Sequence, residues 1–442
     1  ADQRKINDAL TRIGDGYFMK SDFANAEDYY NQSYIMHLLN ADYALFQKAL
    51  AEGVQKKYKE KIADLKLFIN NYGSSNSSLN QKARFELAMA YYQNKQNDVA
   101  LEAFKKFVVD FPNSIYESPC LSKIGLIYYN NKDDDNALLY FDKLIKHDRK
   151  STDAITAIEI VKQIYASKGK VDELDAYLTS VGAAMSSVAL DTIAYNYGKT
   201  HYLMQDCRSA ATDFERYITK FPNGIFILQA NFYRAECEYK LGNADSSYTN
   251  YVYVTQQPKG EYAEQALTRA ADIAYKRKDY STALDFYKQL EQTAILPKNN
   301  SAAIVGQMRC NYYLKNYAEA IASSNKTMGI EKIGAELTSE AHYIIASSLF
   351  ESNKLEEALP EYQTVANTNR GERGAEARYQ VAFIQFKRSE YKQSQKTALA
   401  LISGEGDFPV WDNKALLLIA DDYLALNDNF QAKATLRSII SE

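Results

Sequence analysis

Proline and glycine are scarce in this chain, at 7 and 18 of 442 residues. Proline breaks the interior of a helix and glycine weakens it, so their scarcity favours a chain that is mostly helical. Cysteine is rarer still. The four cysteines show no CxxC spacing, which argues against zinc sites and thioredoxin-type chemistry.

Long apolar runs are also missing. The longest, from Ala415 to Ala420, is six residues, far short of the ~20 residues of a membrane-spanning helix. No basic stretch followed by an apolar stretch stands at Ala1, so no signal peptide is visible. A mature or trimmed chain would look the same, and the compartment stays open.

The chain has no large excess of either charge. Its 52 basic and 56 acidic residues give a formal net charge of −4. Nucleic-acid binding needs a strong positive field, so no nucleic-acid partner is expected. The short clusters Asp133-Asp134-Asp135 and Lys276-Arg277-Lys278 fall at predicted turns and are interpreted as solvated loops.

Catalytic and cofactor motifs are absent. The four histidines are scattered without an HExxH pattern, and neither GxSxG nor a dinucleotide fingerprint occurs. Gly198-Lys199-Thr200 looks like the end of a phosphate loop, but position 193, where the first glycine belongs, is Ile193. His201 is interpreted as a packed core residue. We therefore expect no enzyme, no cofactor and no metal site.

What the chain does have is a repeat. A mostly small residue, alanine in nine of twelve cases, returns every ~37 residues, and a second series of small residues precedes it by twelve positions. The first series is Ala26, Ala63, Ala100, Ala137, Leu174, Ala210, Ser247, Ala283, Ala320, Ala358, Ser394 and Ala432. A fixed period of this length indicates a stack of similar supersecondary units.

The stretch 81–114 shows one repeat most clearly. Apolar residues at helical spacing predict a first helix around Ala88, a polar turn follows at 94–98, and a second helix runs through Ala100 to the break at Phe111-Pro112. The two small residues are expected where the antiparallel helices cross, because a large side chain there would overpack the crossing.

These residues carry a family resemblance. Ala88, Tyr91, Ala100, Phe104 and Pro112 follow the pattern of the tetratricopeptide repeat, which the whole chain resembles. The resemblance implies an all-α, right-handed solenoid of about twelve helix-turn-helix repeats in one continuous domain, 1–442. The repeats, numbered one to twelve below, are predicted to start near residues 7, 44, 81, 118, 155, 191, 228, 264, 301, 339, 375 and 413.

The resemblance also implies a function. Repeats of this length, with endings such as 108–114, look most like tetratricopeptide proteins of the Gram-negative cell envelope, of the outer-membrane assembly lipoprotein and Tol–Pal-associated types. We therefore expect a non-catalytic scaffold or adaptor that binds protein partners, located in the periplasm or at the outer membrane. A cytoplasmic location stays open.

Two stretches depart from the pattern. Repeat five has Lys162 and Leu174 where small residues belong, which predicts a wider helix crossing and a change of curvature at 155–190. The stretch from Leu401 to Pro409 is a longer, glycine-containing connection.

In the family, the fifth and twelfth positions of each repeat lie seven residues apart on one face of the first helix and line the concave side. Here many are aromatic, which predicts a groove for an extended peptide or a helix, with charges between the rings giving specificity. Two alternatives stay open: the rings pack between repeats as structural residues, or the groove binds glycans. The predicted groove residues are Phe85, Tyr92, Tyr129, Tyr195, Lys199, Tyr202, Phe232, Glu236, Tyr239, Asp272, Tyr275, Arg309, Tyr312, Tyr343, Phe350, Tyr379 and Phe386.

Two further questions concern particular side chains. Cys207 and Cys237 lie on helices expected to pack together, so they are either a disulfide or two free thiols. The last predicted helix has no following helix to cover its apolar residues Leu436, Ile439 and Ile440. Either the array continues beyond Glu442, or this end docks on something such as a second copy.

Overall fold

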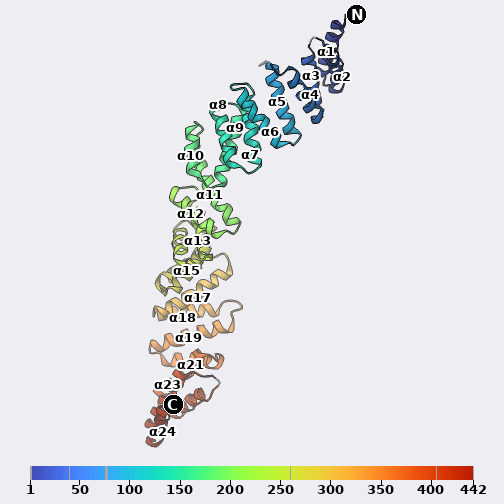
Figure 1. The fold of residues 1–442 in the computed structure, drawn as a ribbon. Coiled ribbons are helices and arrows are strands. Elements are labelled where there is room, and N and C mark those ends of the chain that lie inside the picture. The colour runs from blue at the N-terminus through green and yellow to red at the C-terminus, as the bar shows by residue number, and fades with distance from the viewer. Residues whose placement is uncertain (1, 39, 75–77, 259, 405, 442) are drawn as a thin grey trace. The chain divides into compact units, whose positions relative to one another are not determined.

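A computed structural model describes residues 2–38, 40–74, 78–258, 260–404 and 406–441 of the chain (Figure 1). Over these residues it consists of twenty-four α-helices and contains no β-strand. The prediction of an all-α solenoid of about twelve helix pairs is confirmed. Within the described ranges, none of the helices has the length and apolar character required to cross a bilayer.

The chain forms two compact units, residues 1–194 and 195–442, which are described separately; the boundary lies within α11 (Ser187–Leu203). The single continuous domain stays a prediction. The helices before α11 are α1 (Gln3–Met19), α2 (Phe23–Ile35), α3 (Ala41–Val54), α4 (Tyr58–Tyr72), α5 (Ser78–Gln93), α6 (Asn97–Asp110), α7 (Glu117–Asn130), α8 (Asp134–His147), α9 (Thr152–Ser167) and α10 (Val171–Ser180). Those after it are α12 (Cys207–Lys220), α13 (Ile227–Lys240), α14 (Ala244–Thr255), α15 (Ala263–Lys276), α16 (Tyr280–Thr293), α17 (Pro297–Tyr313), α18 (Tyr317–Met328), α19 (Ala335–Glu351), α20 (Leu355–Thr368), α21 (Glu372–Lys387), α22 (Tyr391–Ile402), α23 (Pro409–Ala425) and α24 (Asn429–Ser441).

The turn between the two helices of a repeat has a recurring backbone conformation. A residue with positive φ follows the first helix, for example Lys95 at 59°, Lys132 at 64° and Lys278 at 61°. Because this residue is left-handed, backbone N–H groups of the turn can donate hydrogen bonds to the last carbonyl groups of the first helix. In repeats five and seven this position is a glycine, Gly169 and Gly242. The other repeats tolerate the modest strain of a side chain in this conformation.

Aromatic rings explain the small residues of the first helices. A Cβ added to Gly14 would lie 2.8 Å from the ring of Tyr30, and one added to Gly125 would lie 2.4 Å from the ring of Phe141. The ring of the second helix therefore lies directly on the backbone of the first. The first helix needs a small residue here because the aromatic ring of the second helix occupies the space where a side chain would lie. The spacing of the small residues does not by itself show this contact.

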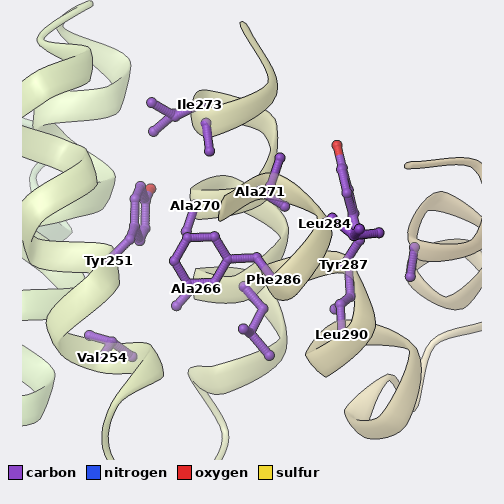
Figure 2. Close-up of a cluster of buried hydrophobic side chains, with 14 of the residues drawn as sticks. Tyr251, Val254, Ala266, Ala270, Ala271, Ile273, Leu284, Phe286, Tyr287 and Leu290 are labelled. Atoms are coloured by element: carbon purple, nitrogen blue, oxygen red, sulfur yellow. The ribbon is translucent and has the colours of Figure 1, made fainter. Parts of the chain in front are cut away.

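The core is a series of apolar clusters, each spanning neighbouring helices. Figure 2 shows one of them, in which Phe286 of α16 points towards Tyr251 of α14 and lies beside Ala266 and Ala270 of α15, while Tyr287 of α16 lies on the other side. All five side chains are buried. Since each cluster joins helices that are close in sequence, the fold needs no single central core.

Repeat two departs from the predicted register. Ala63 is exposed, whereas Lys61, two residues earlier, is only 4% exposed and occupies the crossing. The left-handed turn residue is likewise shifted, to Lys56. The placement of Ala63 in the alanine series was therefore wrong, because a lysine stands where every other repeat has Ala, Ser or Leu.

Repeat five has the large residues at its crossing that the sequence indicates. Leu174 is fully buried, while Lys162 is partly exposed and pairs with Glu159 at 2.7 Å. Helix α10 is only ten residues long, and it contacts α9 over less of its length than α16 contacts α15. The change of curvature stays a prediction.

Candidate partner-binding surface

The predicted groove residues all lie on first helices, and none of them is fully exposed. Tyr195, Phe232 and Glu236 are buried, and the others are partly buried. The structure therefore places these side chains at a packed surface that keeps part of each remaining ring accessible.

The rings at the fifth position stack on the next repeat. Phe85 stacks on Tyr116 with ring centroids 4.8 Å apart, and Tyr195 stacks on Phe226 at 4.3 Å. Phe232 lies 4.5 Å from Tyr262 in a tilted arrangement.

Each partner ring belongs to the residue immediately before the following first helix, at Tyr116, Phe226 and Tyr262. These offset aromatic contacts join consecutive repeats. At these three places the fifth-position ring is part of the packing between repeats.

The rings at the twelfth position also contact neighbouring side chains. Tyr202 lies 4.5 Å from Tyr233, and the guanidinium of Arg269 lies 4.3 Å above the ring of Tyr239. Tyr129 donates a hydrogen bond to Gln163 at 3.2 Å. One face or edge of these rings remains partly exposed, as a contact surface requires.

The predicted specificity charges are already engaged within the protein. Glu236 accepts a hydrogen bond from the hydroxyl of Tyr251 at 2.6 Å, and Asp272 accepts one from Tyr287 at 3.1 Å. Burial raises the pKa of both tyrosines, and the neighbouring carboxylates raise it further. These carboxylates anchor second-helix tyrosines on the first helices, a role that the sequence analysis missed.

Arg309 is also paired. Its guanidinium donates two hydrogen bonds to Glu340 of the next first helix, at 2.9 and 2.7 Å. The hydrogen bond to Glu340 is the largest influence raising the pKa of Arg309. Lys199 lies over the ring of Tyr195 at 5.6 Å.

Two cavities open on this surface in the C-terminal unit. One, of ≈ 610 Å³, is lined by the predicted residues Asp272, Tyr275 and Arg309 and is called the 272–337 cavity. The other, of ≈ 870 Å³, is lined by the predicted Tyr312 and Tyr343 and is called the 312–376 cavity.

Both cavities are closed on one side by a connection between repeats. Residues 330–334 line the 272–337 cavity and residues 368–372 line the 312–376 cavity. Lys276, interpreted from sequence as part of a solvated loop, lines the first of them and is exposed. No periodic signal marks these connections, because they vary in length and composition from one repeat to the next.

The other residues singled out from the sequence have structural surroundings. His201 is partly buried, and its Nδ1 lies 2.6 Å from Asp213. Cys207 and Cys237 are free thiols, and burial raises the pKa of Cys237. Ile440 is 86% exposed.

Comparison with known proteins identifies the repeat. The tetratricopeptide repeat model matches residues 82–114, 120–151, 194–224 and 414–442. Each matched segment begins one to three residues after the start predicted for repeats three, four, six and twelve. No curated protein matches the chain.

Three solved structures resemble the chain distantly. The complex of Naa15/Naa10 bound to HypK-THB is 15% identical over 97% of this chain and 68% of its own, with a TM-score of 0.40. The MamA protein is 17% identical over 40% and 90%, with a TM-score of 0.34. YrrB, described as a TPR protein with an unusual peptide-binding site, is 16% identical over 43% and 91%, also at 0.34. Scores this low do not bear on the function of this chain.

The matched segments recur in phase with the helix pairs, and the small residues of the pattern lie where those helices cross. The chain therefore contains tetratricopeptide repeats at residues 82–114, 120–151, 194–224 and 414–442.

Proposed function

We propose that the chain is a non-catalytic scaffold that binds protein partners through the aromatic surface of its first helices. One observation carries the proposal: five of the predicted groove residues line the two cavities of the C-terminal unit. Cavities with aromatic walls and a few charged groups are typical of sites that hold the side chains of a bound chain.

The packing of the rings favours a protein partner over a glycan. Sugar rings stack on aromatic faces that are left open, but Phe85, Tyr195 and Phe232 already stack on neighbouring rings. A glycan array incubated with the whole chain is the direct comparison. Strong glycan binding without peptide binding would replace the proposed function by the glycan alternative.

Site-specific photo-crosslinking tests the surface. A photoreactive phenylalanine analogue at Tyr312, which lines a cavity, should crosslink to a protein partner in extracts of the source cell. The same analogue at Leu139, exposed on the second helix α8, is the control. A crosslinked partner is then purified, and its affinity is measured with the wild-type chain and a Tyr312→Ala variant.

Crosslinking at Leu139 but not at Tyr312 would move the interaction to another face. In the stretch around repeats six and seven, the double change Tyr202→Ala and Tyr239→Ala should weaken the same partner. If both affinity and melting temperature are unchanged, the surface does not extend to these repeats.

We also propose that the scaffold acts in the cell envelope of a Gram-negative bacterium, on the basis of its repeat length and endings such as 108–114. Fractionation of source cells followed by immunoblotting tests this. Recovery with the periplasm or outer membrane supports the location, and recovery with cytoplasmic markers overturns it.

A further inference from the structure

The two cavities occupy the same place in consecutive repeats. Tyr275 and Tyr312 hold the twelfth position of repeats eight and nine, and each lines one cavity. Val305 and Tyr343 hold the fifth position of repeats nine and ten, and again each lines one cavity. The first helices α17 and α19, which carry these fifth positions, contact each other directly.

The 272–337 cavity has an excess of positive charge on an apolar wall. Ile330, Ile333 and Leu337 supply much of the apolar lining. Among the residues that the structure describes, its exposed cation Lys276 has no ion pair, and the ion pair of Lys332 with its neighbour Glu331 is 4.0 Å long and almost fully solvated.

The other two charged groups of this cavity have internal partners. Arg309 pairs with Glu340, and Asp272, which keeps its negative charge, accepts a hydrogen bond from Tyr287. An apolar side chain with an adjacent carboxylate therefore fits the 272–337 cavity, since the carboxylate can pair with Lys276 and Lys332.

The 312–376 cavity has the opposite balance. Arg373 is paired with Glu336 at 3.1 Å and lies over the ring of Tyr343. Among the lining residues, the acidic Glu336, Glu372 and Glu376 outnumber the basic Arg370 and Arg373. Burial raises the pKa of Glu376, against the lowering influence of Tyr343, Lys414 and Arg373.

Resting on the proposed function, we propose that the paired cavities recognise one extended peptide. It carries an acidic residue beside an apolar residue in the 272–337 cavity and a basic residue in the 312–376 cavity. Packed helices lie about 8–10 Å apart, and an extended chain advances about 3.3 Å per residue. The apolar and basic residues are therefore about three positions apart.

Fluorescence anisotropy with synthetic peptides tests the proposal on the full chain. The probe is fluorescein-Gly-Ser-Asp-Leu-Ser-Gly-Lys-Ser-Gly, in which leucine and lysine are three positions apart. A series with this separation varied from about one to six residues should bind most tightly near three. Equal affinity at every separation, or no binding by any member, overturns the proposal.

Charge reversal adds a second readout. Lys276→Glu with Lys332→Glu should weaken the probe about tenfold or more, and should bind better than wild type a peptide in which lysine replaces the aspartate. The matched control is Lys95→Glu with Lys132→Glu, two exposed turn cations of the N-terminal unit, which should leave affinity unchanged. An unchanged preference in the first variant contradicts the proposal.

The outcome is separable from the proposed function. If a protein partner crosslinks at Tyr312 but the peptides show no spacing optimum, the scaffold function stands and the two-cavity recognition fails. If no partner crosslinks at Tyr312 while the spacing optimum and the charge reversal are observed, the peptide site stands without the broader surface.

Discussion

Repeats two and eight share a helix-turn-helix backbone but fill their crossings with different chemistry. In repeat eight, Ala283 is fully buried, and the ring of Tyr287 is fixed by a hydrogen bond to Asp272. In repeat two, buried Lys61 occupies the crossing and reaches Glu86 of the next first helix at 2.6 Å. The same fold thus accepts a charged crossing when the neighbouring repeat supplies the counter-charge.

The two kinds of crossing are destabilised by different changes. An apolar crossing is destabilised by a larger side chain, because close-packed groups leave no room for it. A charged crossing is destabilised by removal of one partner, because the other charge is then buried without a counter-charge. Changes in the two repeats should therefore separate these two kinds of failure.

The largest expected difference is in pH dependence. Burial raises the pKa of Glu52 in repeat two, with nearby Asp64, to about 8. The folded chain then keeps this proton where the unfolded chain, with a value of 4.5, has released it. The free energy of unfolding should fall as pH rises from 4.5 to about 8, by about 1.4 kcal/mol per unit of pKa shift.

Urea denaturation followed by circular dichroism, at about pH 5 and about pH 9, measures this fall. Glu52→Gln should flatten the profile, since its amide does not titrate. An identical pH profile in wild type and variant would show that Glu52 titrates in the same range whether the chain is folded or unfolded.

Next in size is the loss of the buried cation. Lys61→Ala should destabilise the chain by about 3 kcal/mol, because it opens a cavity and leaves Glu86 without its partner. Adding Glu86→Leu should restore much of the loss. If the double variant is no more stable than the single one, the ion pair is not what holds this crossing.

Overpacking in repeat eight should have a smaller effect. Ala283→Leu adds three carbons to a fully buried site and should cost about 1–3 kcal/mol. The control is Ala318→Leu on the exposed face of α18, expected within about 0.5 kcal/mol of wild type. Thermal melts of both variants give the comparison, and equal stabilities would mean that repeat eight can expand without cost.

The smallest expected effect is the loss of one hydroxyl. Tyr287→Phe keeps the ring on the first helix but removes the donor to Asp272, for about 1 kcal/mol. Repeat five, with Leu178 at the equivalent position, lacks such a hydrogen bond. If a Tyr287→Phe variant is as stable as wild type, the packing of this ring stabilises repeat eight and its hydrogen bond does not.

The helix pairs could be predicted from sequence because small residues recur at a fixed interval, and steric exclusion at a crossing leaves a strong pattern. The burial of Lys61 could not be predicted in this way, because a buried lysine is tolerated here only with Glu86, a residue of the next repeat. No rule of local periodicity connects the two.

The candidate surface was predictable only in part. The repeat positions of Tyr312 and Tyr343 placed each of them on the predicted face of its first helix, but the cavities beside them also depend on the connections 330–334 and 368–372. The partners of Phe85 and Tyr195 had a signal that went unused: an aromatic residue four positions after Pro112 and again after Pro222.

The stacked rings between repeats have a consequence for how the protein opens. Tyr195 with Phe226 and Phe232 with Tyr262 tie three successive repeats, six to eight, to one another. In a linear array, such nearest-neighbour ties set how far a local opening spreads before it stops. Repeats six to eight should therefore exchange their amide hydrogens as one cooperative block.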